Sequence, residues 1–162
     1  MRKAPGTDPR PLLMRLPADE IPASLMARTS FLLHRSGMAL IHQFAVALAP
    51  LRIRPHHFHV LQVLSLGRPA SQIDIAEPLG FDRNKMVNIV DELEELGLAR
   101  RETNPEDRRA KAVALTDTGR ATLKAAQELE RAVEEEYLAP LAPEQRAQLH
   151  ELLRTLATAK RD

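Results

Sequence analysis

Residues 71–119 decide the fold, and their sequence is SQIDIAEPLGFDRNKMVNIVDELEELGLARRETNPEDRRAKAVALTDTG. Ser71 precedes a short segment, Gln72–Leu79, and Gly80 then permits the sharp reversal that a tight turn between two helices demands. Asp82 begins the next segment, where its side chain can accept hydrogen bonds from the first unpaired backbone N–H groups of a helix. The pattern predicts two short helices joined by a tight turn.

The apolar residues of this pair predict which sides of the helices are buried. In the first helix the buried candidates are Ile73, Ile75, Ala76 and Leu79. The second helix has an apolar stripe at helical spacing until Gly97 ends it. That stripe consists of Met86, Ile89, Val90, Leu93 and Leu96. The outward N-terminal end of the second helix is polar, with Arg83, Asn84, Lys85 and Asn88.

The next segment carries strand and turn signals. Leu98–Thr103 and Lys111–Leu115 flank a polar stretch, residues 104–110, which predicts a β-hairpin with a long tip. Residues 98–115 hold five basic and three acidic residues, a net charge of +2. Thr116 is the expected N-cap of the helix that follows.

Longer helices are expected on both sides of this region. No proline interrupts Ser24–Ala49, and apolar residues recur there at helical spacing, which predicts one long amphipathic helix. Pro50 and Pro55 then bracket a turn before a short apolar helix that ends at Gly67. Two further helices are predicted after residue 116, separated by two prolines. Their apolar residues are Leu123, Ala126, Leu129, Val133, Tyr137, Leu149, Leu152, Leu153 and Leu156.

Four prolines in residues 1–20 predict a loose basic arm, in which Leu12, Leu13 and Met14 are candidates for docking. The alternative is a disordered tail.

Composition agrees with a helical protein and excludes several classes of function. The 162 residues amount to about one domain, and Leu (25) and Ala (23) dominate the apolar set while aromatic residues make up only 3%. An all-β fold is therefore not expected. The absence of cysteine excludes disulfides, thiolate metal sites and thiol nucleophiles. The longest apolar run, Phe44–Ala49, is far shorter than a membrane span, so we expect a cytoplasmic protein that does not contact a membrane.

The order helix, short helix, glycine turn, helix and basic hairpin is that of a winged helix-turn-helix. A helix fits the major groove of DNA, and a hairpin beside it can reach the minor groove. Asn pairs with adenine and Lys or Arg with guanine, while Arg suits the narrow minor groove of A·T-rich DNA. The fold class is thus mainly α with a small β-hairpin wing, and the predicted ligand is double-stranded DNA.

Several motifs resemble those of the MarR family of transcriptional regulators. They are residues 71–77 (SQIDIAE), residues 90–98 (VDELEELGL), Asp107-Arg108-Arg109, and residues 115–119 (LTDTG). Their order and spacing carry the resemblance, which covers about residues 24–160. Pro78 departs from the pattern because it must kink or end the first motif helix. Asn84 and Lys85 stand where the family often has small hydroxyl residues, so the base preference cannot be transferred.

The resemblance implies a homodimer with a helical dimerisation region formed by residues 21–50 and 117–162. It implies a DNA-binding lobe over residues 51–116, preceded by an N-terminal arm over residues 1–20. Two-fold symmetry implies a pseudo-palindromic operator with half-sites about 10 base pairs apart. The implied DNA-binding residues are Arg83, Asn84, Lys85, Asn88, Asp107, Arg108 and Arg109. Among them, Arg109 corresponds to the wing arginine and Asp107 to its orienting partner, and Arg108 is a candidate for phosphate contact.

Histidines raise two further hypotheses. His56 and His59 lie three residues apart and suggest a metal site, but without Cys or a nearby carboxylate in that helix we expect solvated or core-edge histidines and no metal. His34 and His42 are candidates for binding a small-molecule effector between the dimer helices and the DNA-binding lobe.

The acidic clusters have simpler expectations. Glu128, Glu130 and Glu134–Glu136 are expected on a solvated helix face, and Asp91, Glu92, Glu94 and Glu95 at the far end of the recognition helix, pointing away from phosphate.

The sequence contains no nucleotide-binding loop, nucleophile motif or opposed carboxylate pair, so neither an enzyme nor a bound cofactor is expected. The favoured function is a sequence-specific DNA-binding repressor released by a small molecule. The alternative is a winged-helix protein-interaction module without DNA specificity.

Overall fold

The computed structural model describes residues 11–67, 71–103 and 111–159. The chain is mainly α-helical with one antiparallel hairpin, which confirms the predicted fold class. The first half contains α1 (Leu12–Arg15), η1 (Ala18–Glu20), α2 (Ala23–Met26), α3 (Thr29–Leu48), η2 (Ala49–Leu51) and α4 (Pro55–Leu64). The second half contains α5 (Gln72–Leu79), α6 (Arg83–Glu95), β1 (Ala99–Thr103), β2 (Lys111–Leu115), α7 (Asp117–Tyr137) and α8 (Pro143–Thr158).

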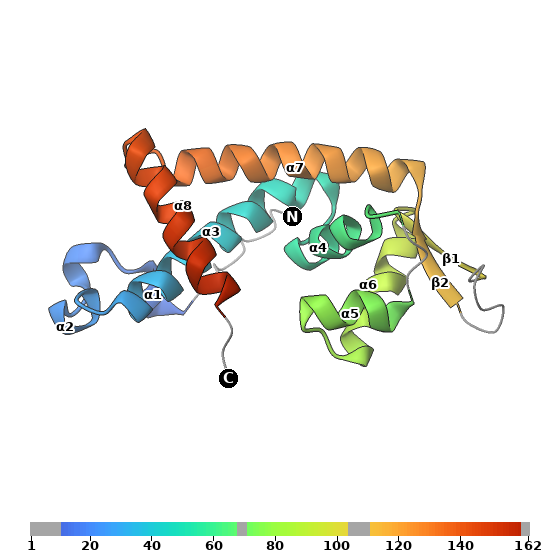
Figure 1. The fold of residues 1–162 in the computed structure, drawn as a ribbon, viewed down its shortest axis with the longest axis horizontal. Coiled ribbons are helices and arrows are strands. Elements are labelled where there is room, and N and C mark those ends of the chain that lie inside the picture. The colour runs from blue at the N-terminus through green and yellow to red at the C-terminus, as the bar shows by residue number, and fades with distance from the viewer. Residues whose placement is uncertain (1–10, 68–70, 104–110, 160–162) are drawn as a thin grey trace, which may run out of the picture.

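Figure 1 shows two ends joined by the long helix α7. One end holds α4, α5, α6 and the hairpin, and the other holds α8 together with α1, α2 and the start of α3. Helix α3 packs against α7, and α7 also contacts α4. The helix-turn-helix and the hairpin are therefore carried as one lobe on a helical frame.

The hydrophobic core lies inside this lobe. Phe58 and Leu61 of α4, Ile75 of α5, and Val90 and Leu93 of α6 are all fully buried. The Phe44 ring of α3 meets the Phe58 ring edge-on, with 5.0 Å between centroids. Because α3, α4 and α6 share this core, α6 is attached to the helical frame by packing as well as by the chain.

The hairpin is joined to α7 by a short capped connection. Thr116 is the N-cap of α7, as predicted: its Oγ1 accepts from the Gly119 N–H at 2.9 Å and donates to the Gly97 carbonyl at 2.7 Å. A Cβ at Gly119 would lie 2.0 Å from the Leu98 carbonyl oxygen, so the close approach of α7 to the hairpin requires glycine there.

Two predictions about the N-terminal third were wrong. The expected single helix from Ser24 is divided into α2 and α3, because Arg28 is extended and breaks the helix. The loose arm was predicted over residues 1–20, of which residues 1–10 lie outside the described residues, and residues 11–20 contain α1 and η1 instead. Arg35 holds this segment against α3 by donating to the carbonyls of Leu13 (2.9 Å) and Leu16 (2.5 Å).

The prediction that Ile73 is buried was also wrong, because this side chain is 68% exposed while Ile75 is fully buried. Residues two positions apart in a helix are about 200° apart around its axis, so one helix face cannot bury both.

Pro78 lies in the last turn of α5, which ends one residue later. The reversal that follows keeps its ordinary form: Gly80 has φ 62°, and the Phe81 N–H donates to the Ala76 carbonyl at 3.0 Å. The departure at Pro78 therefore leaves the turn of the motif intact.

No single helix among the described residues is long and apolar enough to cross a membrane. Helices α3 and α4 would together pass that test by length and composition, with a bend of 75° between them. Residues of both helices, including Phe44 and Phe58, are buried in the core of the lobe.

Candidate nucleic-acid interface

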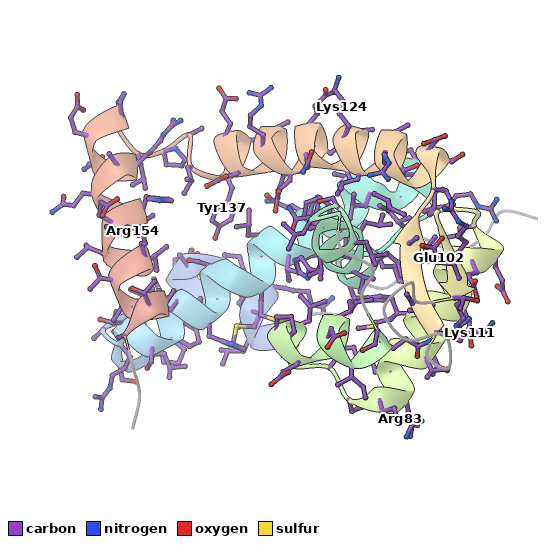
Figure 2. The ribbon with its side chains drawn as sticks, turned by 45° about the vertical axis from the view of Figure 1, so that its right-hand side comes forward. Arg83, Glu102, Lys111, Lys124, Tyr137 and Arg154 are labelled. Carbon is purple, nitrogen blue, oxygen red and sulfur yellow. The ribbon has the colours of Figure 1, made fainter. Side chains whose placement is uncertain are left out.

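The N-terminal end of α6 is polar, exposed and well capped. Oδ1 of Asp82 accepts from the Lys85 N–H at 2.8 Å, which confirms the predicted cap. The structure brings together the four candidates of the recognition helix, all exposed: Arg83, Asn84, Lys85 and Asn88. Figure 2 shows Arg83 extending outward from the end of the lobe.

Helix α5 supports this end of α6 from behind. Ser71 caps α5, with its hydroxyl and backbone N–H paired to Asp74. Beyond the turn, the Lys85 ammonium lies 3.7 Å above the centre of the Phe81 ring. This contact orients Lys85 while leaving it exposed, so its charge remains available to an anionic ligand.

The two strands of the wing pair in register from Ala99 opposite Leu115 to Thr103 opposite Lys111. Lys111 is exposed at the distal end of β2 (Figure 2). Three predicted site residues, Asp107, Arg108 and Arg109, lie outside the described residues.

The acidic half of α6 is paired internally, by contacts that the sequence did not reveal. Asp91 Oδ1 lies 2.6 Å from Nη2 of Arg101 in β1. Glu94 also pairs with the Arg101 guanidinium, and its Oε1 accepts from the Arg101 backbone N–H at 2.6 Å. Arg101 is one of the basic residues of the hairpin, but its charge is neutralised within the lobe by Asp91 and Glu94.

The third acidic residue, Glu92, pairs with α4 and the residue before it. Its Oε2 accepts from Nη2 of Arg54 at 2.8 Å and from Nε2 of His57 at 2.7 Å. Fixed carboxylates on a surface that meets DNA would repel phosphate. Arg54 and Arg101, which pair with Asp91, Glu92 and Glu94, offset two of these three negative charges.

Known proteins share this arrangement. The MarR family profile matches residues 53–110, which span α4 to the wing. The transcriptional repressor CouR, in a structure bound to a 23-mer DNA duplex, is 33% identical to this chain, with a TM-score of 0.75 and coverage of 83% of this chain and 95% of CouR.

The chain belongs to the MarR family of transcriptional regulators. CouR from Rhodococcus jostii RHA1 bound to p-coumaroyl-CoA is 29% identical, with a TM-score of 0.72 over 85% of this chain and 97% of that one. A MarR-family protein of Mycobacterium tuberculosis in complex with DNA is 27% identical, with a TM-score of 0.71 over 82% and 99% of the two chains. The resemblance predicted from the motifs is confirmed.

In this MarR-family protein, one polar side chain among the described residues is fully enclosed. His57 is 2% exposed, and both of its ring nitrogens are used. Nδ1 accepts from the Arg54 backbone N–H at 3.2 Å, so the proton is on Nε2, which donates to Glu92. Burial lowers the pKa of His57 and outweighs the opposing effect of Glu92, which keeps the ring neutral.

As candidate metal ligands, the structure groups a different set of side chains from the predicted pair of His56 and His59. The ligand atoms of His56, His57 and Glu92 instead lie within 4.8 Å of one another. This set does not suit a divalent metal, because His57 accepts an N–H at Nδ1 and would have to lose its remaining proton to ligate through Nε2. The Arg54 guanidinium on Glu92 adds a competing positive charge.

A groove of about 1400 Å³ lies at the other end of this MarR-family chain, between α3 and the junction of α7 with α8. Its walls are largely apolar and include Leu32 and Leu33 of α3 and Leu153 of α8, and Tyr137 extends from α7 into it (Figure 2). His34, which is exposed, and His42, which is partly buried, lie on other faces of α3 and do not line the groove.

Proposed function

We propose that this MarR-family regulator is a homodimeric repressor that binds double-stranded DNA at a pseudo-palindromic operator and is released by a small-molecule effector. The observation that carries the proposal is the capped, exposed, polar N-terminal half of α6, presented beside a two-stranded wing. Two relatives with this fold have been solved with DNA, which supports the same role here.

Each predicted DNA-binding residue has a proposed role. Asn84 and Asn88 read base edges in the major groove, where an Asn amide can pair bidentately with adenine. Arg83 and Lys85 contact guanine or phosphate. From the resemblance, Arg109 enters the minor groove with Asp107 orienting it, and Arg108 contacts phosphate.

Exposed leucines support the homodimer. Leu152, Leu153 and Leu156 of α8 are 58%, 40% and 51% exposed, and they lie at the end of the molecule opposite to α6 (Figure 1). Contiguous apolar surface of this kind is costly in water and is typical of a protein interface. We propose that a second copy covers this surface and places two recognition helices on successive major grooves.

The effector acts by population shift. A small molecule releases DNA only if it binds a conformer whose two lobes have the wrong spacing better than the DNA-binding conformer. CouR has been solved with p-coumaroyl-CoA, so an aromatic acyl-CoA thioester is the first class of effector to test. His34 and His42 stay predicted effector contacts.

The experiment is to incubate the purified protein with sheared genomic DNA, sequence the retained fragments and footprint one of them. The proposal expects a two-fold symmetric site with half-sites about 10 base pairs apart, and affinity that falls steeply with salt. Recovery of no enriched fragment at modest salt would overturn it. Binding that is independent of salt and sequence would favour the protein-interaction module.

A further inference from the structure

We propose that the acidic half of α6 is a two-sided clamp, in which Glu92 and Glu94 are positioning residues that set the rotation of the recognition helix. The proposal rests on the DNA-binding function proposed above. It gives a role to the acidic cluster beyond pointing away from phosphate.

The clamp has one arm on each flank of α6. Successive helix residues are about 100° apart around the axis, so Glu92 and Glu94 lie about 200° apart. Glu92 is held by His57 and Arg54, at the start of α4. Glu94 is held by Arg101 in β1, which also pairs with Asp91.

Both arms of the clamp are more rigid than ordinary surface ion pairs. On the α4 side, the His57 ring is buried and its second nitrogen is fixed by the Arg54 N–H, so it cannot turn away from Glu92. On the β1 side, Glu94 accepts from the backbone N–H of Arg101 as well as from its side chain. A backbone donor within a paired strand cannot rotate.

The face that the clamp orients is the one that meets DNA. Asn84 and Asn88 are four residues apart and share the exposed side of α6, between the flanks marked by Glu92 and Glu94. The buried residues Ile89 and Leu93 occupy the opposite side. A rotation of the helix that breaks either arm would turn the two amides away from the base edges.

The hydrophobic core alone leaves this rotation less constrained. Apolar contacts are non-directional, whereas a hydrogen bond weakens steeply as its angle departs from linearity. The directional pairs on both flanks therefore add the angular constraint that base reading needs. Arg101 also links the clamp to the wing, since it belongs to β1.

The test compares Glu92→Ala and Glu94→Ala with the matched control Glu95→Ala. Glu95 carries the same charge in the same helix, is exposed, and makes no side-chain hydrogen bond or ion pair within the described part of the chain. Removing a negative charge near DNA should strengthen binding through electrostatics, and the control reports that effect. The clamp predicts that Glu92→Ala and Glu94→Ala weaken binding to the operator instead.

The measurement is the ratio of affinity for a fragment retained in the genomic selection to affinity for a random duplex of equal length. For Glu92→Ala and Glu94→Ala we expect this ratio to fall about fivefold or more relative to Glu95→Ala, with the salt slope unchanged, because no phosphate contact is removed. Glu92→Gln keeps an oxygen that can accept from His57 and should retain most of the ratio.

Thermal unfolding of each variant separates misorientation from loss of the fold. If the folded variants Glu92→Ala and Glu94→Ala match Glu95→Ala in this ratio, the clamp is overturned while DNA binding stands. If the unmodified protein retains no fragment, the proposed function fails and the clamp fails with it.

Discussion

Nε2 of His57, at the start of α4, lies 2.7 Å from Oε2 of Glu92 in the recognition helix, and 35 residues separate the two along the chain. The histidine is 2% exposed and its other ring nitrogen accepts from the Arg54 backbone N–H. A single neutral side chain thus caps α4 and holds α6. This double role makes the pair sensitive both to substitution and to protonation.

The wing arginine gives the first prediction. Arg109→Ala should weaken binding to the operator and reduce the slope of log affinity against log salt by about one unit, because one cation is lost from the DNA interface. Filter binding or fluorescence anisotropy over a salt series measures both quantities. Lys124→Ala, on the outer side of α7 (Figure 2), is the control and should change neither. Unchanged operator affinity in Arg109→Ala would contradict the wing assignment.

Acid should destabilise the protein through the histidines of α4. Burial first, and then the electrostatic effects of the neighbouring His57 ring and Arg54 guanidinium, lower the pKa of His56 from 6.5 to about 4, and burial also lowers the pKa values of His57 and His59. Between pH 6.5 and about 4, His56 therefore binds a proton in the unfolded chain and not in the folded chain. The contribution of these histidines to the free energy of unfolding is therefore complete above pH 6.5 and is lost as the pH decreases toward 4.

Urea unfolding at pH 7.5 and pH 5 measures this loss before most carboxylates titrate. His56→Asn should reduce the difference between the two pH values, since it removes one of the three groups. An equal difference in the variant and the unmodified protein would show that His56 takes no part.

The close contact at Gly119 predicts a large effect of one methyl group. Gly119→Ala should lower the free energy of unfolding by about 1–3 kcal/mol or more, because the new Cβ would meet the Leu98 carbonyl oxygen at 2.0 Å. Thr118→Ala, at the exposed neighbouring position, should change it by less than about 0.5 kcal/mol. Chemical denaturation of the two variants gives the comparison, and equal stability would argue against the tight junction between α7 and the hairpin.

The leucines of α8 predict the assembly state. The double variant Leu152→Glu and Leu156→Glu should sediment as a monomer, because two charges would be buried without partners in the proposed interface. It should also lose operator affinity, since two linked lobes bind far more tightly than one. Glu151→Gln, on the same helix, is the control. A dimer of unchanged mass in the double variant would place the interface elsewhere.

Local sequence was sufficient for most of the fold. Ser71, Asp82 and Thr116 were each predicted as helix starts, and each is the N-cap of a helix. A capping side chain bonds to a backbone group only three residues away, so the outcome depends little on the rest of the molecule. The hairpin and the reversal at Gly80 follow from equally short-range signals.

Tertiary structure decided which groups meet. Glu92 was expected at the far end of α6, but its pairing with His57 and Arg54 depends on how α4 and α6 pack, as the pairing of Arg101 with Asp91 depends on how the hairpin folds back. The break at Arg28 likewise accompanies the return of residues 11–20 onto Arg35. Residues close in sequence fix the helices and turns, whereas the meeting of distant charges requires the relative rotation of whole elements, which short-range signals do not encode.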